Sequence, residues 1–217
     1  MSSRVLLAAA AATVLLGACA MRPAGNSPSF FVTGANPGKG ADFGGLEGAD
    51  RYCQALGTAA GAGQRTWRAY LSATASGNAP AVNARDRIGT GPWFNTKGTL
   101  IAYNLNELHT APNISKQTAL TEKGEMVSGR GDAVNMHDIL TGSKADGTVA
   151  TGTGDTTCGN WTSSGEGSAI VGHHDRLGLS EDAPAKSWNA SHPTRGCSLD
   201  ALKSTGGGGR LYCFAAN

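Results

Sequence analysis

The residues whose types could do chemistry are concentrated between Cys158 and Cys197. This stretch holds two tryptophans and three histidines among carboxylate, amide and guanidinium groups. An exposed indole ring can stack on the C–H face of a sugar, while polar neighbours hydrogen-bond to its hydroxyls. The pattern therefore favours a site for a polyol ligand. The ligand-binding candidates are Asn160, Trp161, His173, His174, Asp175, Arg176, Trp188 and Asn189, and His192 and Arg195 belong to the same polar set.

A structural interpretation of the same residues stays open. Trp161 and Trp188 could instead pack around a disulfide, because small cystine-containing domains often bury tryptophan beside the bridge. Asp175 and Arg176 could form a charge pair that only holds a loop in place.

Calcium is the only metal ion that we expect as an alternative to a metal-free site. Adjacent side chains on a strand point to opposite faces, so His173 and His174 would need a turn to share one ion. We therefore assign no transition-metal site to this pair and expect no resident cofactor other than calcium. The calcium candidates are Glu181, Asp182 and Asn189.

Known catalytic templates are absent from the sequence. It has no Gly-x-Ser-x-Gly elbow, no His-Glu-x-x-His and no Gly-x-x-x-x-Gly-Lys-Ser/Thr loop. The glycine run 206–209 lacks the lysine of a phosphate cradle and is expected to form a flexible hairpin. We assign no catalytic residue and expect no enzyme. A cell-wall hydrolase with dispersed Asp, His and Ser remains the enzymatic alternative.

The first residues have the order of an export signal. Arg4 precedes an apolar run over residues 5–16, which is too short to span a bilayer. The following Leu-Gly-Ala-Cys resembles the bacterial lipobox, which implies lipidation of Cys19 and anchoring by acyl groups in the bilayer. An ordinary secretory signal is the alternative. Residues 1–18 are then the signal peptide, 19–29 a flexible tether and 30–217 one domain.

Composition restricts the class of protein. The chain has 217 residues with 32 glycines, 16% charged residues and a formal net charge of +2. The domain is long enough for a core of its own. No basic run is present, which argues against a nucleic-acid partner.

The cysteines indicate an oxidising compartment. Four remain after Cys19, an even number that predicts two disulfides in an exported chain. Three pairings are possible from the sequence alone. No Cys-x-x-Cys pair occurs and the spacings are long, which argues against zinc bound by these cysteines.

Periodicity predicts the elements that position the candidate site. A first strand is expected over 30–33, and a helix over 45–55 with Cys53 on its apolar face, ended by Gly57 and Gly61. Further on, we expect half-buried strands over 67–72 and 210–214, because apolar and polar residues alternate there.

A long loop is expected near the candidate site. Residues 141–157 are mostly Gly, Thr, Ser, Asp and Ala, which is too polar a composition for a core segment. We predict that this segment lies on the surface.

The order of these segments resembles the endostatin-like (collagen NC10) branch of the C-type lectin-like fold. The resemblance rests on the helix with Cys53, on Thr66–Ser72, Val82–Asp86, Cys158 and Cys197, and on the terminal Tyr212-Cys213-Phe214. It implies an α+β domain with two helices, small antiparallel sheets, a long loop region and adjacent termini. It also implies that Cys53 pairs with Cys213 and Cys158 with Cys197.

The sequence departs from the sugar-binding members of that fold. Ala190 follows Trp188-Asn189 where those lectins have Asp, and no Glu-Pro-Asn or Gln-Pro-Asp triplet occurs. Calcium-dependent sugar binding is therefore not implied.

The predicted function is that of a binding module held in the cell envelope by its lipid anchor. The expected partner is a carbohydrate or surface glycan, and the alternative is a protein or matrix adhesin. Ala20 and Met21, in place of an aspartate after Cys19, favour the outer membrane, with the domain outside the cytoplasm.

Overall fold

The computed structural model describes residues 27–152 and 154–217. The predicted signal peptide, Cys19 and most of the tether lie outside the described residues. The predicted α+β class with small sheets is confirmed. The helices are α1 (Gly45–Ala59), α2 (Leu105–Thr110), α3 (Cys158–Trp161) and α4 (Leu199–Ser204), with 3-10 turns at Ala84–Asp86 and Pro184–Lys186. The strands are β1 (Phe30–Val32), β2 (Trp67–Ala69), β3 (Trp93–Phe94), β4 (Leu100–Ala102), β5 (Asp138–Leu140), β6 (Ile170–His173), β7 (His192–Pro193) and β8 (Gly207–Ala215).

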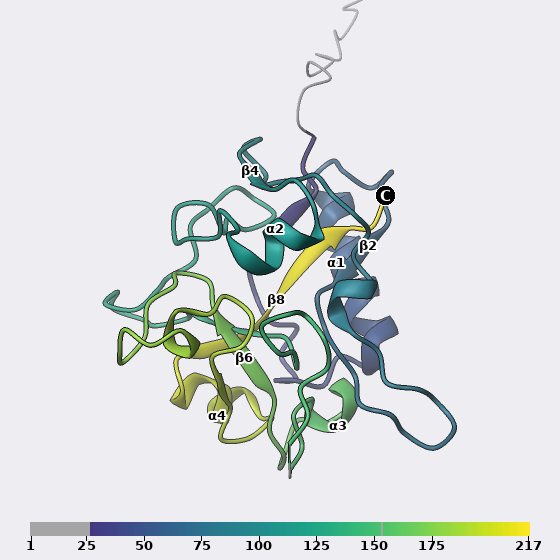
Figure 1. Ribbon diagram of the computed structural model, residues 1–217, viewed down its shortest axis with the longest axis vertical. Coiled ribbons are helices and arrows are strands. Elements are labelled where there is room, and N and C mark those ends of the chain that lie inside the picture. Colours follow the sequence, from purple (N-terminus) through teal and green to yellow (C-terminus); the bar gives the residue numbers. More distant parts are fainter. Residues whose placement is uncertain (1–26, 153) are drawn as a thin grey trace, which may run out of the picture.

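Strand β8 is the centre of the main sheet. The sheet has the order β1-β8-β5-β6-β7, and β2 also pairs with β8. Strand β5 runs parallel to β8, whereas β1 and β2 pair with it antiparallel. In Figure 1, β8 crosses the middle of the molecule, with α1 on one side and β6 and α4 on the other. A separate hairpin is formed by β3 and β4.

The sheet carries apolar side chains on both faces, because neighbouring residues of a strand point in opposite directions. Leu211 and Cys213 of β8 pack in one cluster with Trp67 and Trp161. Tyr212, the residue between them, packs in the other cluster. The central strand is therefore covered by core on both sides.

Two disulfides close the domain, paired as the resemblance implies. Cys53 on α1 is bonded to Cys213 on β8, and Cys158 at the start of α3 is bonded to Cys197. Disulfides of this kind are typical of an oxidising, extracytoplasmic location. Within the described ranges, no helix has the length and apolar character needed to cross a membrane.

Helix α1 differs from its prediction in length. It runs on through Gly57 to Ala59, so Gly57 does not end it, whereas Gly61, with a φ of 79°, directly follows the C-cap residue Ala60 as expected. Gly57 lies on the buried face, where a Cβ atom would come within 2.3 Å of Trp67 Nε1. The glycine is a packing requirement here and not a helix terminator.

Two further expectations about segments are corrected. Glycines 207–209 are the buried beginning of β8 and form no free hairpin. The 141–157 segment is not only a surface loop, since Thr141, Ser143 and Thr157 are fully buried.

The number and length of elements also differ from expectation. The described residues contain four α-helices, where two were expected. The strand expected over 67–72 ends at Ala69, although Ser72 still donates its amide to Thr141 O.

Candidate functional site

Three histidines surround one buried carboxylate at the end of the main sheet. Asp138 Oδ1 lies 3.2 Å from His137 Nε2, 3.3 Å from His173 Nε2 and 3.5 Å from His192 Nε2. We call these four residues the histidine cluster. The rings of His137 and His173 are stacked, with centroids 4.1 Å apart.

The register of three neighbouring strands produces this convergence. Asp138 of β5 is paired directly with His173 of β6, so both side chains lie on one face of the sheet. His192 of β7 is paired with Val171, which shares a face with His173 two residues later. The cluster therefore lies on the same face of the sheet as the buried residues Leu140 and Val171.

Glycines of the terminal run let the cluster approach β8. A Cβ atom at Gly206 would lie 3.2 Å from the His137 ring, and one at Gly207 would lie 3.0 Å from Asp138 Cβ. Both distances are shorter than most contacts that Cβ atoms make in proteins. The glycine run is thus part of what positions His137 and Asp138.

The Asp138 carboxylate is buried without a hydrogen bond in the described part of the chain. Both of its oxygens and His173 Nε2 are buried polar atoms that lack a hydrogen-bond partner there. The short nitrogen–oxygen distances are therefore contacts in which the ring nitrogens do not aim at the oxygen. Leaving such a group unpaired in a protein interior is costly.

Each ring of the cluster uses its other nitrogen to contact an oxygen atom. His137 Nδ1 lies 3.2 Å from Asp175 Oδ1, and His173 Nδ1 lies 2.7 Å from the carbonyl oxygen of Ala185. His192 Nδ1 lies 3.0 Å from the carbonyl oxygen of Pro193. A carbonyl oxygen can only accept, so Nδ1 of His173 and of His192 carries the proton. In the neutral rings, Nε2 is left with a lone pair on the side of Asp138.

Electrostatics favour the ionised carboxylates. Burial acts to raise the pKa of Asp138, but the facing histidines, in their protonated forms, hold it below its usual range. Burial likewise acts on Asp175, yet hydrogen bonds from His137 and from two backbone amides hold its pKa well below normal. The Asp138 carboxylate in turn raises the pKa of His192.

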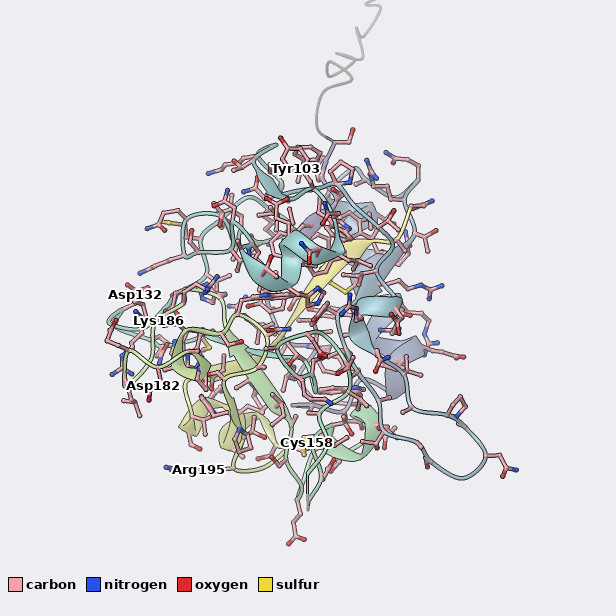
Figure 2. All side chains as sticks on the ribbon, viewed as in Figure 1. Tyr103, Asp132, Cys158, Asp182, Lys186 and Arg195 are labelled. Carbon is pink, nitrogen blue, oxygen red and sulfur yellow. A yellow bond between two sulfur atoms is a disulfide. The ribbon has the colours of Figure 1, made fainter. Side chains whose placement is uncertain are left out.

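A pocket of about 590 Å³ opens beside the cluster. It is lined by His137, His173 and His192, and Arg130 and Arg195 supply positive charge. Most of its lining comes from residues 173–195, the region where ligand binding was predicted. The His192 side chain is 34% exposed, whereas that of Asp138 is 2% exposed, so the cluster meets solvent at His192. Figure 2 shows Arg195 and Asp182, another lining residue, on the same side of the molecule.

Both predicted stacking residues are in the core. Trp161 is fully buried in the cluster that contains the Cys158–Cys197 bridge, and its indole N–H donates to Ser72 O. Trp188 is 3% exposed and packs against Tyr70 and Tyr212. Sugar stacking needs an exposed ring, so this structure favours the packing interpretation for both residues. Of these two tryptophans, only Trp161 packs in the hydrophobic cluster that contains the Cys158–Cys197 disulfide.

The two predicted asparagines hold backbone segments together. Asn160 Oδ1 accepts from the amide of Thr74, and its Nδ2 donates to Thr74 O. Asn189 is buried, and its Nδ2 donates to Tyr70 Oη and to Lys144 O. Neither residue belongs to the histidine cluster.

The run 173–176 is divided between different roles. His173 belongs to the cluster, whereas His174 is buried and its Nε2 lies 3.3 Å from Ser128 O. Burial lowers the pKa of His174 to about 4. Asp175 supports His137, and Arg176 donates to Lys186 O. Asp175 is therefore paired with His137 and not with Arg176.

The calcium candidates have separate partners. Glu181 forms an ion pair with Lys186, Asp182 Oδ2 accepts from Ser180, and Asn189 is held as described above. Glu181 and Asp182 are exposed, whereas Asn189 is buried. These contacts give no indication of a shared calcium ion.

His137 and Asp138 were missed in the sequence. They stand directly before the short apolar pair Ile139-Leu140, which is the only local signal. Their role depends on β5 pairing with β6, a contact between residues 35 positions apart, as shown by Asp138 and His173.

Comparison with known proteins gives no relative. No family model matches the sequence, and no curated protein matches it at a significant level.

Proposed function

We propose that this protein is an extracytoplasmic binding module that takes a carbohydrate in the pocket beside the histidine cluster. The observation that carries the proposal is the pocket itself, of about 590 Å³, in which serine, histidine and arginine side chains stand among apolar lining atoms. Its volume falls within the range of small-molecule sites. Buried tryptophans have no part in this proposal.

The pocket lining suits a hydroxyl-rich ligand with an acidic group. Ser180, Ser191 and Ser204 offer hydroxyl groups that can both donate and accept hydrogen bonds. Arg130 and Arg195 can hold a carboxylate or sulfate by paired N–H donors. A glycan that carries uronic acid or sulfate combines both features.

A glycan array with matched variants tests this proposal. We expect binding of acidic glycans that falls at least about tenfold in Arg195→Ala and Arg130→Ala, the loss of about one charged hydrogen bond. Arg51→Ala is the control, since Arg51 is an exposed residue of α1 that pairs with Glu47. Equal binding by all three variants, or no binding to any glycan, contradicts the proposal.

A protein partner is a second candidate, favoured by one observation. Leu179 on the pocket wall is 91% exposed, and the nearby Leu177 is 48% exposed. Exposed apolar side chains beside arginine are common at protein interfaces. Adhesion to cells that survives enzymatic removal of glycans, and that is lost in Leu179→Asp, would favour this second function.

We further propose that the domain is C-type-lectin-like and is anchored through lipidated Cys19. The order of the disulfides and the pairing of β1 with β8 support the fold assignment. The lipobox-like residues before Cys19 support the anchor. Labelled fatty acid should be incorporated into the wild-type chain in bacteria and not into Cys19→Ser. Labelling of both chains would contradict the anchor.

A further inference from the structure

We propose that the histidine cluster is a binding site for a zinc-type divalent cation. The ligands would be Nε2 of His137, Nε2 of His173 and Oδ1 of Asp138, which all lie within 4.8 Å of one another, and a fourth position would be left to water from the pocket. The inference concerns a metal site in its own right and does not depend on whether the pocket takes a glycan.

The spacing of the atoms is that of ligands around one ion. Zinc bonds to histidine nitrogen and carboxylate oxygen are about 2.0–2.2 Å long, so neighbouring ligand atoms of a tetrahedral site lie roughly 3.3–3.5 Å apart. Asp138 Oδ1 lies 3.2 Å from His137 Nε2 and 3.3 Å from His173 Nε2, and the three atoms all lie within 4.8 Å of one another. Both distances therefore match edges of a tetrahedron to within about 0.2 Å, the tolerance used for metal sites. His192 Nε2, 3.5 Å from the same oxygen, does not belong to this group.

A bound ion would also explain why the ring nitrogens are close to the Asp138 oxygen but poorly aligned with it. No hydrogen bond joins His173 Nε2 to Asp138, although the two atoms are 3.3 Å apart. Ligands of one ion point at the ion and not at one another. A ring nitrogen in such a site is close to the carboxylate oxygen yet aimed beside it.

The rings are held in the tautomer that binds metal. The Nδ1 atoms of His137 and His173 contact Asp175 and Ala185 O, which leaves Nε2 free to coordinate. Metal-bound histidines usually donate their second N–H to a carboxylate or a backbone carbonyl in this way. Asp175 is itself fixed by the amides of Arg130 and Leu177.

The charges of the site favour a dication. Asp138 is an ionised, buried ligand, and Asp175 places a second carboxylate behind His137. Two carboxylates and two neutral imidazole ligands balance one divalent cation. Imidazole ligands favour Zn²⁺ and its transition-metal neighbours over Ca²⁺ or Mg²⁺.

The competing state is a proton shared within the cluster. A protonated histidine would also neutralise Asp138, but it predicts no specific affinity for metal. It also predicts no effect of Asp175 on metal binding.

Calorimetric titration of the chelator-treated full chain with Zn²⁺ tests the proposal. We expect one equivalent to bind, with affinity reduced about 10–100-fold in Asp175→Asn, a residue behind a ligand. His173→Ala, which removes a ligand, should reduce affinity further. His109→Gln is the matched control, because it removes an imidazole outside the cluster and should bind Zn²⁺ like wild type.

Cobalt substitution keeps the test decisive if a variant fails to fold. The wild-type chain loaded with Co²⁺ should show the intense visible absorption of a tetrahedral ion. Absence of stoichiometric Zn²⁺ binding, a six-coordinate Co²⁺ spectrum, or unchanged affinity in both His173→Ala and Asp175→Asn would overturn the proposal.

Discussion

Asp138 and His173 face each other across β5 and β6 with Oδ1 and Nε2 3.3 Å apart, yet no hydrogen bond joins them. Both side chains are buried. A fold that keeps two such groups together needs a compensating positive charge. The cation that we propose would supply that charge, and the stability of the protein should then depend on metal.

Zinc should raise the melting temperature of the chelator-treated protein. A ligand at 100 times its dissociation constant stabilises the native state by about 2.7 kcal/mol, or about 5–10 °C for a domain of this size. Asp138→Asn should lose this increase, because the ionised ligand is gone. Scanning calorimetry with and without Zn²⁺ measures both. An equal increase in Asp138→Asn would show that zinc acts elsewhere.

The two disulfides should contribute unequally to stability. Cys53 and Cys213 are 160 residues apart and Cys158 and Cys197 are 39 apart. On the chain-entropy model, closing these loops stabilises the fold by about 5 and about 4 kcal/mol. Urea denaturation of the two double-alanine variants compares them. A larger loss from removing Cys158–Cys197 would contradict the entropic explanation.

Gly57→Ala should destabilise the protein by about 1–3 kcal/mol, although alanine is the better helix former. The added Cβ would come within 2.3 Å of Trp67 Nε1. Gly165→Ala is the control, since a Cβ there meets no atom within 4 Å. Chemical denaturation gives both values, and a neutral or stabilising Gly57→Ala would show that the Trp67 contact is not tight.

His109 should make stability depend on pH. Its Nδ1 contacts Leu105 O and its Nε2 contacts Tyr70 Oη, so the neutral ring satisfies both atoms. Burial lowers its pKa, with smaller opposing effects from Leu105 and Asp146 and a smaller lowering effect from Arg85. Because the folded pKa is below the unfolded value, the contribution is complete above about pH 6.5 and is lost as the pH falls.

His109→Gln should therefore lose less stability than wild type between pH 7.5 and pH 5.5, pH values set to either side of about 6.5. Urea midpoints in the presence of chelator measure the difference without interference from metal. A steeper loss of stability in the variant would mean that protonation of His109 stabilises the folded protein.

The sequence predicted the parts of the fold that depend on local patterns. The apolar period around Cys53 gave the helix α1, and the alternation near Cys213 gave the last strand. The disulfide pairing required the resemblance, because composition alone left three possibilities.

The sequence could not predict what depends on strand register or burial. Asp138 meets His173 only because β5 pairs with β6, and His192 joins them from a third strand. Trp188 looked like a stacking platform but packs against Tyr212, since a tryptophan beside polar residues can face either way. His173 was predicted as a site residue, but its partners were not.

X-ray absorption at the zinc edge of the loaded full chain tests the metal site most directly. We predict two imidazole nitrogens and one carboxylate oxygen at about 2.0–2.2 Å. A shell of water oxygens without imidazole, or fewer than two imidazoles per ion, would contradict the site formed by Asp138, His137 and His173.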